Sequence, residues 1–101
     1  SIQLNLPYDV YVDRRGSLYV SEYDGHRVKK FINESANGIM IAGTGSAGSN
    51  LNQFWSARYM SFDATETYMF VADTFNHRVF RFLANATAGA NGTVVAGGNG
   101  Y

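Results

Sequence analysis

The chain has 101 residues, of which 46% are hydrophobic and 16% charged, so it suits one ordinary globular domain rather than a disordered segment. Eight basic residues balance eight acidic ones, which disfavours nucleic acid and anionic membranes as partners, and the absence of cysteine excludes disulfides and thiolate metal sites. The sequence contains no run of about 18 apolar residues, so it predicts no helix that crosses a membrane.

Eight short apolar runs, separated by turn residues, follow one another along the chain, and each is typical of a β-strand. The expected strands are residues 8–12, 18–21, 27–32 and 39–42, followed by 58–62, 68–72, 78–83 and 93–96. The segments between them, such as DRRGS and EYDGH, are rich in residues suited to tight turns. Because no segment has sustained helical periodicity, the sequence predicts an all-β chain.

The second half of the chain repeats the first. LYVSEYDGHRVKKF at residues 18–31 aligns with MFVADTFNHRVFRF at 69–82, and this alignment places His26 and His77 51 positions apart. The chain therefore divides into two units of four strands each, residues 1–52 and 53–101.

Several of the expected strands are apolar on both faces, as in Val10-Tyr11-Val12, so both faces of each sheet must be covered. With no helices predicted, the cover must be more sheet. Four-stranded antiparallel sheets stacked face to face in a ring form a β-propeller, usually with about four to eight blades. An eight-stranded sandwich is the alternative, but it would not require two halves with the same turns in the same places.

The repeated phrases LPYDVYVD, GSLYVSEYDGHRVKKF and MFVADTFNHRVFRF resemble NHL repeats, the motif named for Asn-His-Leu. The resemblance extends over nearly the whole chain. NHRV at residues 76–79 matches the signature best, whereas the first unit has Gly25 in the place of Asn76 and Glu22 in the place of Asp73. The resemblance implies propeller blades, commonly about six to a ring.

Two blades cannot close a ring, and each end of the stack would expose an apolar face larger than monomers usually tolerate. The chain is therefore expected to be a fragment of a longer array or to complete the ring by association with copies of itself. Three copies would give six blades, so a homotrimer is expected if this is the whole polypeptide. A dimer with four blades and a tetramer with eight are the alternatives.

The repeated His-Arg pairs have a catalytic or metal-binding interpretation and a structural one. An active site needs one constellation rather than one per blade, so we interpret the pairs as ties between strands and blades through Asp13, Asp63 or backbone groups. This repeat signature comprises Asp13, His26, Arg27, Asp63, Asp73, His77 and Arg78. Because no HxH, HExxH or EF-hand spacing is present, we assign no catalytic residue, metal ligand or cofactor.

One side of the ring is expected to carry the ligand. Alternating strand direction places the loops between second and third strands on the same side as the links between blades. That side has aromatic residues and an arginine, a composition typical of protein or peptide contacts. The candidate ligand face is Tyr8, Tyr23, Asp24, Trp55, Arg58, Phe75 and Asn76. The alternative role for each of these aromatic side chains is packing between blades. In propellers of the NHL type this face commonly binds protein, and in some cases RNA.

The other side carries three N-x-[ST] sequons, at Asn33, Asn85 and Asn91, all in loops between third and fourth strands. In a eukaryotic secreted protein, glycans there would cover that side; otherwise these are polar loop residues. The sequons slightly favour an extracellular location.

Two functions follow from these observations. The first is a non-catalytic binding or scaffold module that assembles into a closed propeller and presents a loop face to a protein or peptide. The alternative is a fragment of a metal-dependent lyase or hydrolase with its site in the central channel. The resemblance includes such enzymes, and here the ligands would have to come from Asp24, His26, Asp73 or His77, or from repeats outside this chain.

Overall fold

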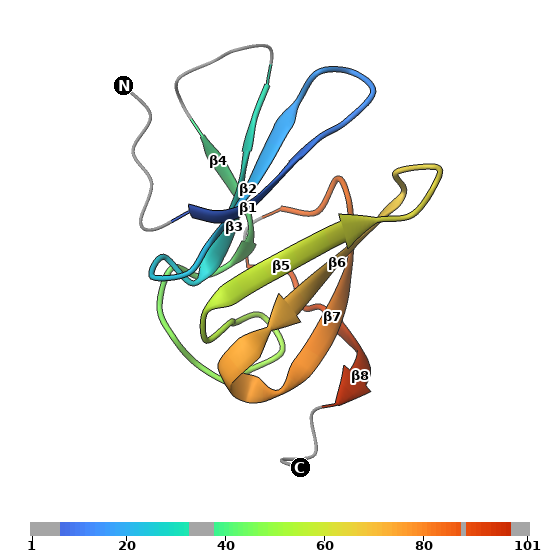
Figure 1. Ribbon diagram of the computed structural model, residues 1–101. Coiled ribbons are helices and arrows are strands. Elements are labelled where there is room, and N and C mark those ends of the chain that lie inside the picture. The colour runs from blue at the N-terminus through green and yellow to red at the C-terminus, as the bar shows by residue number, and fades with distance from the viewer. Residues whose placement is uncertain (1–6, 33–37, 88, 98–101) are drawn as a thin grey trace.

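The structure is a computed structural model that describes residues 7–32, 38–87 and 89–97. The first sheet contains β1 (Pro7–Val12), β2 (Leu18–Glu22), β3 (Arg27–Phe31) and β4 (Ile39–Gly43). The second contains β5 (Ala57–Phe62), β6 (Tyr68–Asp73), β7 (Arg78–Leu83) and β8 (Thr93–Gly97), with a 3₁₀ turn, η1 (Thr74–Asn76), between β6 and β7. In each sheet the strands lie in chain order and run antiparallel (Figure 1). The prediction of an all-β chain with two four-stranded antiparallel sheets is confirmed.

Each strand begins and ends within one residue of the range expected from the sequence. None of the described residues belongs to a helix long and apolar enough to cross a membrane.

Aspartate side chains build the first hairpin turn of each sheet. The Asp13 carboxylate accepts a hydrogen bond from the backbone N–H of Ser17 at 2.8 Å. The Asp63 carboxylate accepts bonds from the N–H groups of Thr67 and Tyr68, at 2.9 and 3.1 Å. These bonds, above all the one from Tyr68, lower the pKa of Asp63 because they favour the charged carboxylate. The aspartate after the first strand of each unit therefore determines where that strand ends.

The two sheets share their irregularities at equivalent places. The strand register shifts near the start of β1 and again near the start of β5. A second shift lies between the third and fourth strands, after Val28 in one sheet and after Val79 in the other. A bulge changes the direction of nearby side chains. The shifts at the start of β1 and β5 therefore determine which side chains face solvent there.

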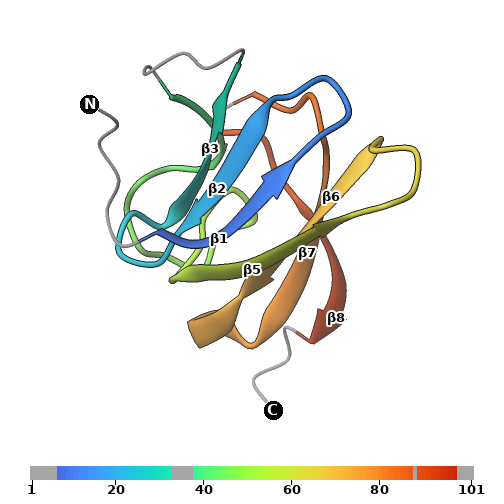
Figure 2. The same cartoon turned by 45° about the horizontal axis from the view of Figure 1, so that its top comes forward.

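The sheets pack against each other with β1 and β2 next to β5, and both views show β1 running beside β5 (Figures 1 and 2). Tyr11 of β1 stacks on Phe62 of β5, with ring centroids 4.1 Å apart, and Tyr19 contacts the same phenylalanine at 4.7 Å. The buried cluster between and beside the sheets is Tyr19, Val28, Ile41, Ala42, Phe54, Ala57, Met60, Met69, Val71, Phe80 and Phe82.

The sheets use opposite faces in this contact. In the repeat alignment Tyr11 corresponds to Ser61, and Phe62 corresponds to Val12. Tyr11 and Phe62 meet at the junction, whereas Val12 is 61% exposed and Ser61 is also exposed. We call the face that carries Val12 in the first sheet, and its counterpart Phe62 in the second, the front. The front of the second sheet therefore packs on the back of the first, and the two repeats are stacked in the same direction.

Hydrogen bonds add to the apolar contact between the sheets. The bonds join the Tyr11 hydroxyl to Glu66 (2.5 Å), the Met60 N–H to the Asp9 carboxylate (3.0 Å), the Ser21 hydroxyl to the Arg58 carbonyl (3.0 Å) and the Ser56 N–H to His26 Nδ1 (2.9 Å). The bond to His26 places the first histidine of the repeat at the junction between sheets.

Candidate ligand surface

Five aromatic residues lie together on one side of the molecule, three of them around Arg58, and we call these five residues and Arg58 the aromatic surface. Arg58 occupies the position in β5 that Tyr8 occupies in β1, and both lie at the register shift that begins their strands. The rings come from both sheets and from the segments that connect them: Tyr8, Tyr23, Trp55, Tyr59 and Phe75.

The rings form an unbroken series of contacts across the two repeats. Tyr59 meets Tyr8 edge to face at 5.2 Å between centroids, and Tyr8 stacks with Tyr23 at 6.0 Å. Phe75 contacts Tyr23 at 6.0 Å on one side and Trp55 at 6.1 Å on the other. Four of the rings are 43% to 53% exposed, and Tyr23 is partly buried. Each ring is thus held by a neighbour and still presents a large apolar area to solvent.

Arg58 provides the positive charge at the centre of this surface. Its guanidinium carbon lies 4.9 Å from the ring centroid of Tyr8, 5.8 Å from that of Tyr23 and 5.9 Å from that of Tyr59. The ion pairs of the described chain are made by Arg14, Arg27 and Arg78, so this charge is balanced by ring faces rather than by a carboxylate. Its Nε is buried and has no hydrogen-bond acceptor among the described residues.

The hydroxyl groups of Tyr8 and Tyr59 lie 3.5 Å apart. This contact lowers the pKa of Tyr8, and the nearby Arg58 charge acts in the same direction. The same neighbouring hydroxyl is the largest cause that raises the pKa of Tyr59, and the charge of an ionised Tyr8 acts in the same direction. The surface therefore offers polar phenol groups as well as apolar ring faces.

Of the seven residues expected on the ligand face, five belong to the aromatic surface. Asp24 follows Tyr23 in the β2–β3 turn and is exposed. Asn76 has a different role, because its amide donates hydrogen bonds to the Gly48 carbonyl at 2.8 Å and to the Asp73 carboxylate at 2.9 Å. Sequence reasoning missed Tyr59, whose direction depends on the register shift at the start of β5.

The repeat signature of the second unit fixes the segment that carries Trp55. The buried Asp73 carboxylate accepts bonds from the Trp55 N–H at 2.7 Å and from Arg78 Nε at 2.6 Å. The same guanidinium donates to three backbone carbonyls of the link between the sheets, those of Ser49 (2.9 Å), Asn50 (3.0 Å) and Gln53 (3.1 Å). Asp73 and Arg78 thus attach the link, and with it one ring of the aromatic surface, to the second sheet.

In the first unit the corresponding pair is Glu22 and Arg27, with the glutamate fully buried. The acidic partners of the two arginines are therefore Glu22 and Asp73, which face them across the β2–β3 and β6–β7 pairs. Asp13 and Asp63 belong to the hairpin turns described above. His26 and His77 both adopt left-handed backbone conformations, with φ of 53° and 55°. The histidine of each repeat thus occupies a turn position whose positive φ is uncommon for residues other than glycine.

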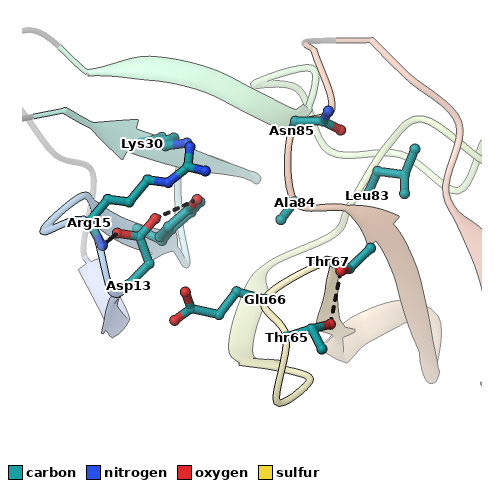
Figure 3. A pocket seen from close by; sticks show the side chains of 10 residues that line it. Asp13, Arg15, Lys30, Thr65, Glu66, Thr67, Leu83, Ala84 and Asn85 are labelled. Atoms are coloured by element: carbon teal, nitrogen blue, oxygen red, sulfur yellow. Dashed lines mark hydrogen bonds between the residues drawn. The ribbon is translucent and has the colours of Figure 1, made fainter.

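The opposite side of the junction has a polar cavity of about 400 Å³ between the sheets. Figure 3 shows Asp13, Arg15 and Lys30 on one wall and Thr65, Thr67 and Asn85 on the other, with Glu66 between them. Lys30 Nζ lies 5.1 Å from the centroid of the Tyr19 ring, and burial raises the pKa of that tyrosine. The charged groups of this cavity include both signs.

Two of the three sequons can be located. Asn85 and Asn91 are exposed and line a second cavity, of about 510 Å³, next to the β7–β8 connection. Asn33 lies outside the described residues. The metal hypothesis can be compared with the same part of the chain: residues 7–32, 38–87 and 89–97 contain no group of three or more His, Asp or Glu side chains placed to hold a metal ion.

Comparison with known proteins gives no further assignment. A scan against known protein families finds none that matches the chain, and none of the curated proteins matches it significantly.

Proposed function

We propose that the chain is a non-catalytic pair of NHL-type propeller blades that assembles through its sheet faces and binds a protein or peptide on the aromatic surface. The observation that carries the binding role is the unbroken series of five rings, four of them about half-exposed, with Arg58 against three of them. Tyrosine, tryptophan and arginine are the residues that contribute most to protein binding sites, because they bury a large area and lose little conformational freedom.

The chemistry of the surface indicates the kind of ligand. Ring faces favour apolar or proline side chains, and the phenol groups of Tyr8 and Tyr59 can bond to main-chain amides of a ligand. Arg58 has no carboxylate partner among the described ion pairs, so a ligand that brings an acidic side chain or a C-terminal carboxylate would complete its pairing. The ligand class is therefore a peptide segment with apolar residues next to an acidic group.

The propeller assignment has separate support. Two sheets with equivalent turns, bulges and acid-arginine pairs are stacked in the same direction, as successive blades of a ring are. Val10 and Val12 on the outer face of the first sheet are 58% and 61% exposed, whereas their counterparts in the second sheet, Met60 and Phe62, pack at the junction. Three chains would complete a six-bladed ring.

Selection from a random-peptide phage library on the immobilised protein tests the binding role. The expected result is enrichment of peptides with apolar residues beside an acidic one, and their binding would change the fluorescence of Trp55, the only tryptophan. Substitution of a central binding ring, as in Phe75→Ala, should weaken such a peptide at least about 30-fold. Arg58→Gln should weaken acidic peptides more than their amide analogues.

Thr65→Ala is the matched control, because Thr65 is exposed in the β5–β6 turn and lies outside the aromatic surface. Selected peptides that bind Phe75→Ala and Arg58→Gln as tightly as the unmodified protein would contradict the proposal. So would a selection that enriches no peptide.

A further inference from the structure

The outward faces of the two sheets are the counterparts of the faces that already pack together inside the chain. By strand register, the front face of the first sheet carries Val10, Val12, Leu18, Val20, Lys29 and Phe31. The back face of the second sheet carries Ser61, Phe70, Ala72, Val79 and Arg81. We infer that these two faces bind each other between copies of this chain, front to back, in one direction only. This inference rests on the assembly part of the proposed function.

The internal junction supplies the template for this contact. There, the back of the first sheet meets the front of the second, and Tyr11 stacks on Phe62 at 4.1 Å. Their counterparts on the outward faces are Ser61 and Val12. Repeating the internal arrangement once more places Val12 of one copy against Ser61 of the next.

The exposed fractions agree with an unfilled version of the same contact. Val12 is 61% exposed and Val10 58% exposed, although both are apolar residues of a strand. On the other outward face, Phe70 is only partly buried, whereas its counterpart Tyr19 is 3% exposed at the internal junction. Val20 and Phe31 on the same front face are only 4% and 3% exposed, so the apolar area that this face offers to a second copy is chiefly that of Val10 and Val12, and the back face offers part of Phe70.

Two of the polar ties of the internal junction are not repeated on the outward faces. Asp9 and Ser21, which bond to the main chain of β5, correspond to Tyr59 and Ala72 in the second unit. Without these two ties, contact between copies would depend more on apolar burial than the internal junction does.

The direction of the contact determines the assembly. A front-to-back interface uses two different patches, so each copy that binds leaves one front and one back face free until a ring closes. A front-to-front contact would instead use one patch twice and stop at a dimer. The internal junction is front to back, and the same two kinds of face remain outside, so the same geometry can continue.

Two variants with a charge at the predicted contact test the direction. Val12→Lys blocks the front face and Ser61→Lys blocks the back face; both positions are exposed, so each variant should fold, which circular dichroism would check. Thr65→Lys adds the same charge in the exposed β5–β6 turn as a control. Light scattering after size exclusion measures the mass against 11.1 kDa for one chain.

The unmodified protein and Thr65→Lys should have about three times the mass of one chain, and each blocking variant alone should be monomeric. An equal mixture of the two blocking variants should form a dimer and nothing larger, because only one intact front meets one intact back. A blocking variant that still dimerises alone, or a mixture that stays monomeric, would overturn the directional contact while leaving peptide binding in place. A monomeric unmodified protein would overturn self-assembly altogether.

Discussion

The buried pair of Asp73 and Arg78 gives the sharpest stability prediction. Asp73 is fully buried and accepts three hydrogen bonds, and the Arg78 side chain is only 8% exposed. Asp73→Ala would leave a nearly buried guanidinium without its carboxylate, and removing one partner of such a pair costs about 3–5 kcal/mol. Since a domain of this size is stable by about 5–15 kcal/mol in total, this is a large fraction.

Urea unfolding followed by the fluorescence of Trp55 measures this loss, because that residue's N–H bonds directly to the Asp73 carboxylate. The melting temperature should fall by at least about 12 °C, taking about 4 °C for each kcal/mol. The double variant Asp73→Ala with Arg78→Met should lose less than the sum of the two single losses, because the orphaned charge is then gone.

Asp63→Ala is the comparison variant, because Asp63 bonds within an exposed hairpin turn, and its loss should be clearly smaller. A loss below about 1 kcal/mol for Asp73→Ala, the value typical of exposed ion pairs, would refute the reasoning that burial makes this pair important.

Three further predictions concern the turns and the junction. The pKa of Asp63 is lowered from 3.8, so the stability that its carboxylate contributes is complete above that pH and is lost as the pH falls through the folded-state pKa. Asp63→Asn should therefore lower the melting temperature at pH 6 and much less at pH 2. The pKa of Tyr11 is raised from 10.0, chiefly by its bond to Glu66, so its contribution is present below pH 10.0 and lost as the pH rises further. Tyr11→Phe should therefore lower stability at pH 7 and remove one step above pH 10.0 in an alkaline spectrophotometric titration. Gly43 has φ of +82°, and an added Cβ would lie 2.4 Å from the His26 carbonyl oxygen, so Gly43→Ala should cost at least about 1–2 kcal/mol in urea unfolding; an unchanged midpoint would contradict the observed backbone.

Local sequence patterns were sufficient for the strands and the hairpin turns. Residues such as Asp13 and Asp63 act within a few positions of themselves, so their spacing predicts where a strand ends. For the His-Arg pairs the same reasoning offered Asp13, Asp63 or backbone groups as partners: Arg78 does bond to backbone carbonyls, but the acids that pair with Arg27 and Arg78 are Glu22 and Asp73. The true partners face the arginines across a strand pair, which requires the register.

The ligand surface could be predicted only in part, for a related reason. Its residue types could be read from the sequence at Tyr8, Trp55 and Arg58. The way in which these side chains come together depends on two bulges, which no turn residue in the sequence predicts. Tyr59 joins the surface through such a bulge. The direction in which the sheets stack was equally hidden, because the strands are apolar on both faces.

The grip of Arg78 on the link between the sheets has a mechanical consequence. Residues 43–50, GTGSAGSN, have the composition of a loose tether that proteases cut easily. A protease must draw the main chain into its cleft, yet one guanidinium holds the carbonyls of Ser49 and Asn50 at the end of this segment, and that of Gln53 just beyond it, at 2.9 to 3.1 Å. The link should therefore resist digestion for as long as the second sheet stays folded. Under tension, the contact between the two sheets should break before the link is pulled into an extended conformation.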